Sequence, residues 1–305
     1  MTIMYADTVE YGGEIFKEHY SARNASLGGT NTYVAGSNNP ALLFYTSKSF
    51  LDFSHMNKYG GLSKLSSISY LFTSNKSDPV FISMINRIVD DISDTREAWN
   101  DNGDLVPEPG EINYFNIKKF SQKELGLKLS FCKKYKRYYF GTSLKPSYTS
   151  VAGFKAYGMS TDIALSTYFY KKILNLNFRV EDIISFKKWS TESTENIIPF
   201  VAIGGTFNFN NMLLSFQMAS DVSYGSPVYY NSGFEYQDRS GLLVFRSGFS
   251  NFNSFTLGLG LKLFLINVDY AFLYPSSNSP FEPSQILSLT INLDNKNWIK
   301  GKLNP

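Results

Sequence analysis

The chain has 305 residues, a formal net charge of +3, 18% charged residues and 16% aromatic residues. A charge this small, with Lys and Arg scattered along the chain, gives no support for nucleic-acid binding, and the single cysteine, Cys132, excludes an intrachain disulfide and a cysteine-based metal site. Few charges, many aromatic residues and no apolar run near the roughly 18 residues of a membrane-spanning helix favour a transmembrane β-barrel.

The first 48 residues differ in pattern from the rest of the chain. Residues 1–21 are polar and mixed, and the first thirteen, MTIMYADTVEYGG, show neither the basic nor the apolar part of a signal peptide, so we expect an exported protein to carry that peptide outside this sequence. Residues 22–44, ARNASLGGTNTYVAGSNNPALLF, are rich in small residues and follow neither the 3.6-residue nor the two-residue period.

We interpret residues 22–44 as a hatch, a compact segment that lies inside a closed sheet. Its glycines allow close approach of backbones and positive φ angles, and its Asn-Pro pair favours a sharp extended turn before the first strand. The alternative is a surface loop ahead of a soluble β domain. The residues assigned to the hatch are Gly28, Gly29, Asn39, Pro40 and Ala41.

Alternation of apolar and polar residues then marks fourteen candidate strands, an even number, as bacterial single-chain barrels require. The clearest is Glu124–Cys132, where four apolar residues alternate with Gly126, Lys128 and Ser130. The other thirteen are Ser49–Met56, Ser66–Phe72, Val80–Val89, Tyr138–Tyr148, Gly158–Phe169, Leu174–Glu181, Pro199–Phe207, Leu213–Ala219, Val228–Tyr236, Leu242–Gly248, Phe255–Phe264, Ile266–Phe272 and Ile286–Leu293.

The connections alternate in length from the second strand on. Lys133–Lys136 is typical of the short ones, whereas Asp90–Phe120 and Asp182–Ile198 are long. Short turns at one rim and long loops at the other are the pattern of an outer-membrane barrel. We therefore predict an all-β fold, a transmembrane antiparallel β-barrel of about 14 strands at residues 49–293, with residues 1–48 as N-terminal segment and hatch, a polar tail at residues 294–305, and a location in the bacterial outer membrane. A soluble barrel or sandwich is the alternative.

The same alternation predicts which side chains face lipid and which face the lumen. Leu257, Leu259 and Leu261 belong to the lipid-facing set. The charges expected in the lumen either line a permeation path or, as we prefer, pair with one another or with polar groups of the hatch, because buried charges need partners. These lumen-facing charges are Asp52, Lys128, Arg246, Lys262 and Asp269.

The long connection at residues 90–120 carries two candidate sites. Trp99, Tyr114 and Phe115 are aromatic anchors for a protein partner. Residues 100–111, NDNGDLVPEPGE, place oxygen ligands at the first, third, fifth, ninth and twelfth positions of an EF-hand-like loop. Leucine at its sixth position and the absence of flanking helices favour a solvated acidic loop over a structural calcium site. The possible calcium ligands are Asn100, Asn102, Asp104, Glu108 and Glu111.

No pattern in the sequence indicates an enzyme. The two histidines, His19 and His55, are far apart and lack metal-ligand spacing. No nucleophile elbow is present, and the glycine pairs do not lead into helices as phosphate loops do. We therefore expect no cofactor apart from the possible calcium ion.

Three motifs, in order along the chain, resemble the PorV/PorQ family of outer-membrane proteins, relatives of the FadL fatty-acid channel. The first is ARNASLGG…NNPA in the hatch. The second combines residues 89–92, VDDI, with residues 113–116, NYFN. The third is residues 258–262, GLGLK, followed by residues 268–272, VDYAF. The polar tail departs from the family, because the last strand does not close on an aromatic residue.

The resemblance implies a monomeric barrel in contact with outer-membrane lipid. PorV acts in type IX secretion, where it receives cargo proteins outside the cell and partners the translocon. Our first hypothesis is therefore a PorV-like accessory or cargo shuttle that binds secreted proteins through residues 90–120. FadL relatives instead pass hydrophobic molecules through a lateral opening, so the second hypothesis is a transporter of hydrophobic small molecules. The third is a structural barrel without transport.

The predicted orientation of side chains can be tested by substitution. A charge at a lipid-facing position near mid-bilayer costs roughly 2–4 kcal/mol. We expect Leu259→Arg to impair assembly into membranes, measured as the heat-modifiable folded band, far more than Lys262→Ala. Equal tolerance of the two substitutions would show that the two faces are assigned wrongly.

Overall fold

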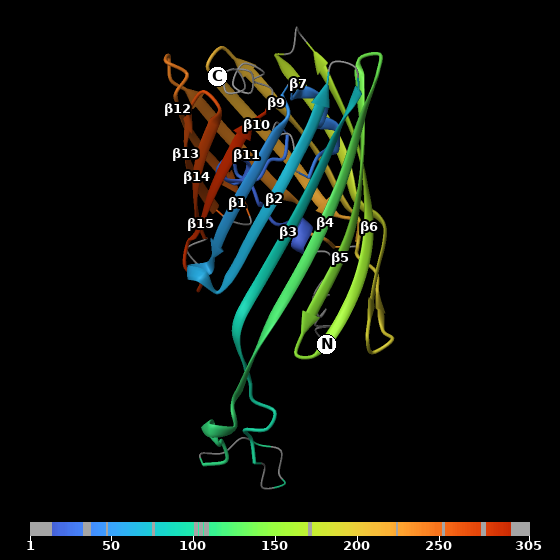
Figure 1. Ribbon diagram of the computed structural model, residues 1–305, viewed down its shortest axis with the longest axis vertical. Coiled ribbons are helices and arrows are strands. Elements are labelled where there is room, and N and C mark those ends of the chain that lie inside the picture. The colour runs from blue at the N-terminus through green and yellow to red at the C-terminus, as the bar shows by residue number, and fades with distance from the viewer. Residues whose placement is uncertain are drawn as a thin grey trace, which may run out of the picture.

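The protein forms a closed antiparallel barrel of fourteen strands around its own N-terminal segment, as the computed structural model shows (Figure 1). This confirms the predicted fold class. The structure describes residues 14–32, 38–46, 48–74, 77–100, 103, 106, 110–169, 173–223, 225–251, 254–275 and 279–293. The barrel strands are β1 (Phe50–Lys58), β2 (Ser63–Ser74), β3 (Ser77–Asp94), β4 (Lys118–Tyr135), β5 (Tyr138–Val151), β6 (Phe154–Phe169), β7 (Leu174–Trp189), β9 (Phe200–Phe209), β10 (Met212–Asp221), β11 (Tyr229–Gln237), β12 (Leu243–Ser250), β13 (Ser254–Lys262), β14 (Ile266–Tyr274) and β15 (Ser284–Asn292).

The ring closes where the first strand meets the last. β1 pairs with β15 in antiparallel register from Phe50 opposite Asn292 to Asn57 opposite Gln285. Every other barrel strand pairs with its neighbours along the chain, and β8 (Thr194–Glu195) only adds a short pairing to the end of β7. Closure removes the free edges that an open sheet would leave at β1 and β15, as is required of a sheet that crosses lipid.

The two rims differ as predicted, although not at every connection. At the short-turn rim, where residues 136–137 join β4 to β5, the connections are all brief. At the long-loop rim, residues 95–117 join β3 to β4 and project well beyond the barrel, at the bottom of Figure 1. This same rim also carries the tight turn at residues 152–153, so length alternates only in part.

Several strands are longer than the sequence pattern indicated, and two of them, β3 and β7, continue past a bulge. β3 continues to Asp94, and β7 continues to Trp189, so the prediction of a loop over Asp182–Ile198 is wrong for its first half. The register of each strand shifts at a bulge, where Asp91 and Asp182 adopt φ angles of +60° and +58°. A bulge inserts a residue and breaks the two-residue period. The alternation therefore does not indicate that the strand continues beyond the bulge.

Side chains on the outside of the barrel form an apolar belt. On β13 the alternate residues Leu257, Leu259 and Leu261 are exposed, Leu259 by 54%. Thr256, which precedes them on the same strand and faces the lumen, is buried. Neighbouring strands repeat this alternation, with Phe245 and Tyr270 exposed on either side of Leu259. A closed sheet with an apolar exterior and a polar interior is the architecture of outer-membrane barrels.

The hatch lies inside this ring, as the blue segments in Figure 1 show. It contains the short helix α2 (Ala22–Ser26) and most of the 3-10 helix η1 (Pro40–Tyr45), and the short helix α1 (Glu14–Lys17) precedes it inside the ring. From here on, hatch means the described residues between 14 and 45, which extends the predicted segment at its start. α2 contacts β12 to β15, and η1 contacts β3 to β6. Two further 3-10 turns, η2 (Tyr59–Gly61) and η3 (Tyr114–Asn116), lie in connections. Among the described residues, no helix is long and apolar enough to cross a membrane.

Small and apolar residues line the wall where the hatch meets it. Ile15 and Phe16 of α1 and Ala25 of α2 belong to one buried cluster with inward-facing Met56 and Ile286 of the wall. Two wall glycines permit still closer approach. A Cβ atom at Gly248 would lie 2.1 Å from the backbone nitrogen of Gly28, and one at Gly141 would lie 2.3 Å from that of Ala41.

The Gly141 contact predicts that a single methyl group will displace η1. Cys132 is buried beneath η1, with its Sγ 3.6 Å from the carbonyl oxygen of Ala41. We expect Gly141→Ala to push η1 away and to speed the reaction of Cys132 with a charged maleimide in folded protein. Thr142→Val, next door on the outer face, is the control. An unchanged labelling rate in Gly141→Ala would contradict the described contact.

Candidate functional site

Several cavities are bounded by the described residues, and two of them lie in the lumen on opposite sides of the hatch. The outer cavity, of about 370 Å³, is lined by hatch residues Lys17, His19 and Asn31 and by wall residues near the long-loop rim, including Phe200 and Tyr229. The inner cavity, of about 190 Å³, lies near the short-turn rim and is lined by Tyr20, Arg23, Asp52, Asp269 and Thr290, among others. The hatch therefore occupies the path between the two rims.

The outer cavity combines aromatic and polar groups. Lys17 Nζ lies 3.3 Å from Asp221 Oδ1 and 5.9 Å from the centre of the Phe200 ring. Phe200 and Tyr229, from β9 and β11, lie side by side with ring centres 6.3 Å apart. A small molecule there would meet an aromatic wall on one side and polar hatch groups, Asn31 among them, on the other.

His19 lies at the floor of the outer cavity, against the hatch glycine Gly29. A Cβ atom at Gly29 would lie 2.1 Å from His19 Nε2, and Gly29 has a φ of +69°, which favours glycine. Burial lowers the pKa of the His19 imidazole, so the ring is neutral at pH 7. Its buried Nδ1 has no hydrogen-bond partner within the described residues, and the residue is part of the cavity lining.

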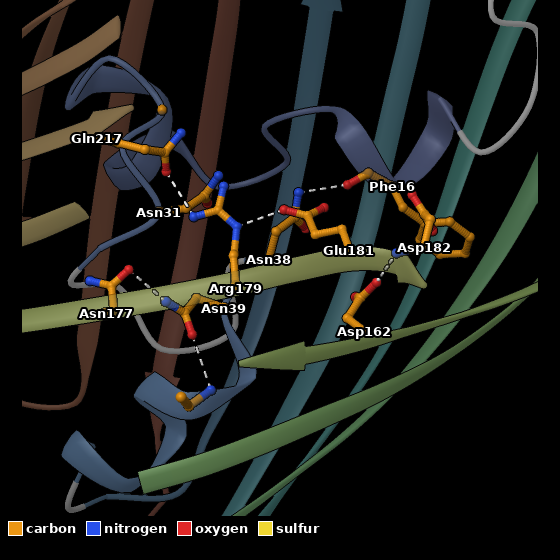
Figure 2. A network of polar contacts seen from close by, with 12 residues as sticks. Phe16, Asn31, Asn38, Asn39, Asp162, Asn177, Arg179, Glu181, Asp182 and Gln217 are labelled. Atoms are coloured by element: carbon orange, nitrogen blue, oxygen red, sulfur yellow. Dashed lines mark hydrogen bonds and ion pairs between the residues drawn. The ribbon is translucent and has the colours of Figure 1, made fainter. Parts of the chain in front are cut away.

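Hydrogen bonds tie the hatch to the wall below this cavity, as Figure 2 shows. Asn38 Nδ2 donates to the carbonyl oxygen of Phe16 at 2.7 Å, and Lys128 Nζ of β4 donates to Asn38 Oδ1 at 3.2 Å. Asn39 Nδ2 donates to Asn177 Oδ1 of β7 at 3.0 Å. These contacts connect α1 and the segment before η1 to one part of the ring, the wall from β4 to β7.

Arg179 and Glu181 of β7 form a charged pair at the base of the outer cavity. Arg179 Nε lies 2.6 Å from Glu181 Oε1, and its Nη1 donates to Gln217 Oε1 of β10 at 2.8 Å (Figure 2). All three residues also line the outer cavity. Because both charges are almost fully buried and partnered, they act as a rigid polar surface.

A second charged cluster connects the hatch to β11, β12 and β14. Arg23 of α2 donates to both carboxylate oxygens of Glu235, at 2.9 and 2.8 Å. Arg246 donates from Nε to Glu235 at 2.7 Å and from Nη1 to Asp269 at 2.7 Å. Two arginines and two carboxylates thus balance one another, and one of the four belongs to the hatch.

A third cluster lies at the bulge of β7. Lys145 Nζ of β5 is 2.6 Å from Asp162 Oδ1 of β6 and 2.7 Å from Asp182 Oδ1. Asp162 also accepts a hydrogen bond from the backbone nitrogen of Asp182 at 3.0 Å (Figure 2). The Lys145 ammonium lies 5.4 Å from the ring centre of Phe16 in the hatch. The bulge turns two successive carboxylates, Glu181 and Asp182, into the lumen.

The five charges assigned to the lumen have different surroundings. Lys128, Arg246 and Asp269 are buried inside the barrel with the partners described above, and Lys262 Nζ donates to Gln237 Oε1 at 3.1 Å. Asp52 accepts hydrogen bonds from Thr290 and Ser54 and lines the inner cavity. Arg246 and Asp269 thus pair with each other and Lys128 bonds to the hatch, whereas Asp52 and Lys262 bond to neutral side chains of the wall.

Most of the partners were missing from the sequence analysis. Lys145, Asp162, Arg179 and Glu235 were not singled out, although each lies on the lumen-facing side of its strand. The alternation of apolar and polar residues indicates that these side chains face the lumen. It does not show which of them meet one another or the hatch. Asp182 had no signal at all, because the bulge reverses the direction that a strict two-residue period assigns.

The aromatic residues of the long connection are exposed on its projecting part. Phe115 is 99% and Tyr114 74% exposed, and both belong to η3. Trp99 is bridged to Ile112 and donates from Nε1 to Glu111 Oε2 at 3.0 Å. Of the possible calcium ligands, Asn102, Asp104 and Glu108 lie outside the described residues. Within the described part, no three His, Cys, Asp or Glu side chains cluster as a metal site.

Comparison with known proteins identifies proteins of similar fold but no family by sequence. No family model and no curated protein sequence matches the chain. Among solved structures, the Pseudomonas putida toluene transporter TodX has a TM-score of 0.61 at 10% identity, over 90% of this chain and 97% of that one. The monoaromatic hydrocarbon channel CymD follows with 0.58 at 10% identity, covering 88% and 96%. A Pseudomonas aeruginosa FadL homologue has 0.53 at 11% identity, covering 88% and 96%.

These likenesses show that the chain has the FadL/TodX-type fold, a fourteen-stranded outer-membrane β-barrel. This fold agrees with the predicted outer-membrane location. The resemblance to PorV and PorQ gains nothing from them, since the matched structures are a transporter, a channel and a FadL homologue.

The Arg246 cluster provides a prediction on stability. Removal of Arg246 leaves the Glu235 and Asp269 carboxylates buried with one cation fewer. We expect Arg246→Ala to lower the free energy of unfolding by about 3–5 kcal/mol, measured by urea unfolding in detergent micelles. Lys118→Ala, which breaks the exposed pair with Glu97, should cost less than about 1 kcal/mol. Similar losses in both variants would refute the buried character of the cluster.

Proposed function

We propose that the protein is a hatch-closed outer-membrane channel for small hydrophobic molecules. The observation that carries the proposal is the position of the hatch, which fills the lumen between an outer and an inner cavity. A structural barrel would need no cavity on either side of a plug. A toluene transporter and a monoaromatic hydrocarbon channel have the same fold, and this supports the choice of transport.

The outer cavity suggests which molecules enter. Its aromatic wall of Phe200 and Tyr229 suits a ring or a short apolar chain, whereas Lys17, His19 and Asn31 suit a polar group. The lining therefore fits an aromatic molecule with one polar substituent better than a pure hydrocarbon. Passage to the inner cavity requires the hatch to shift, because α2 and the residues after it are bonded to the wall across the lumen.

A secretion role is the second candidate. The observation that favours it is the projecting connection, in which Phe115 and Tyr114 are fully or mostly exposed. Exposed aromatic residues on an extended arm suit a protein partner. A PorV-like cargo shuttle would use this arm. Recovery of secreted proteins or a translocon with the native barrel, lost on Phe115→Ala, would favour this candidate over transport.

The transport proposal predicts that fixing the hatch will stop uptake. Thr30 of the hatch and Ser215 of β10 have their hydroxyl oxygens 3.0 Å apart. In a Cys132→Ser background, Thr30→Cys with Ser215→Cys should form a disulfide under oxidising conditions. We expect oxidised cells to take up radiolabelled p-cresol no faster than cells without the protein, and reduction to restore uptake.

A wall-to-wall disulfide provides the control. Ser69 and Ser83 lie opposite each other on β2 and β3, with hydroxyl oxygens 2.8 Å apart, and neither belongs to the hatch. Their double cysteine variant should transport equally when oxidised or reduced. Equal uptake by oxidised and reduced forms of the Thr30–Ser215 variant would overturn the proposal that the hatch moves.

A further inference from the structure

An apolar groove of about 690 Å³ runs along the outer wall near the short-turn rim. Its sides are bulky outward-facing residues of four adjacent strands: Phe131, Phe140, Ile163 and Phe178. Its floor is formed where Thr142 lies opposite Phe131 on one side and Ile163 on the other. The Thr142 hydroxyl donates to the Asp162 carbonyl oxygen at 3.0 Å, so its methyl group remains for contact.

Basic residues gather at the rim end of this groove. Lys133 lies opposite Phe140 in the β4–β5 ladder and lines the groove itself. Lys136 and Arg137 form the turn that follows, roughly 10 Å further toward the rim at the rise of a strand. These three side chains are exposed, and no salt bridge within the described residues includes any of them. Asp78 is the acidic residue in the groove lining.

Aromatic side chains contact two of these cations, Lys136 and Arg137, as expected at a membrane interface. Lys136 Nζ lies 5.4 Å from the ring centre of Tyr135, and the Arg137 guanidinium lies 5.1 Å from that of Tyr138 and 5.9 Å from that of Phe169. Tyrosine with Lys or Arg is the composition of an interfacial girdle. The groove therefore begins at the headgroup level and extends into the hydrocarbon region.

We propose that this groove binds one anionic phospholipid of the inner leaflet, with an acyl chain along Phe131, Phe140 and Phe178 and its phosphate near Lys133, Lys136 and Arg137. Three neighbouring cations against one carboxylate select a negative headgroup over a zwitterionic one. The short-turn rim faces the periplasm in barrels of this architecture, which assigns the lipid to the inner leaflet. The proposal does not depend on what the channel transports.

The test measures which lipids the intact barrel retains. Full-length protein in mild detergent is mixed with equal amounts of phosphatidylglycerol and phosphatidylcholine of the same acyl chains and examined by native mass spectrometry. We expect one phosphatidylglycerol to remain bound in preference to phosphatidylcholine. The triple variant K133A/K136A/R137A should retain phosphatidylglycerol about 100-fold more weakly. Each cation near a membrane surface contributes about fivefold in affinity, and the three factors multiply.

The matched control removes three lysines from the other end of the same strands. Lys123, Lys155 and Lys188 of β4, β6 and β7 are exposed near the long-loop rim, and K123A/K155A/K188A should leave lipid retention unchanged. Thr142→Trp, which fills the floor of the groove, should lower retention of both lipids.

Four outcomes would overturn the proposal. They are equal retention of the two lipids by the native chain, an equal loss in the control triple variant, preference for lipid A when it is mixed with phosphatidylglycerol in the same assay, and a lipid-free dimer that Thr142→Trp dissociates. The last two would assign the groove to the outer leaflet or to a second copy of the chain.

Discussion

Pairing of the backbone and of the charged side chains that are removed from water is the constraint on which this structure depends. On the outside, the pairing of β1 with β15 removes the free edges that an open sheet would present to lipid. On the inside, the hatch displaces water from the lumen and leaves wall charges that need partners. Arg23 of the hatch pairs with Glu235 of the wall, and Lys128 of the wall donates to Asn38 of the hatch, so each supplies polar partners to the other.

The charged clusters also explain how a short, irregular segment stays in one place. α1, α2 and η1 are each too short to be stable alone. Their positions follow from contacts with the wall: apolar packing around Phe16, close backbone approach at Gly141 and Gly248, and the ion pairs of Arg23. A plug held by many separate polar contacts can be rigid at rest and still exchange its partners one at a time, as a channel would require.

Inside and outside the barrel, the same alternation produces two kinds of binding surface. The lumen surface near the long-loop rim is polar with an aromatic wall, and it suits a small molecule on its way through. The outer surface near the short-turn rim is apolar with a basic end, and it suits a lipid that stays. The two surfaces are separate because side chains alternate along each strand, so that one face of the strand lines the lumen and the other faces lipid.

The sequence by itself determined the barrel. Its period of two, few charges and many aromatic residues indicated fourteen strands, and positions such as Leu259 and Asp269 were assigned to the correct faces by parity alone. The glycine-rich segment ahead of the strands also differed enough to be recognised as something other than a strand. These features are local, so a linear pattern records them.

Only the tertiary structure decided which residues meet in the lumen. Lys145 pairs with Asp162 and Asp182, and Arg23 with Glu235, across as many as 212 positions of sequence. The bulge that turns Asp182 inward has no periodic signature. The sizes of the cavities on either side of the hatch depend on how much of the lumen the hatch fills. Distances between segments that are remote in sequence arise from closure of the ring, which no local pattern encodes.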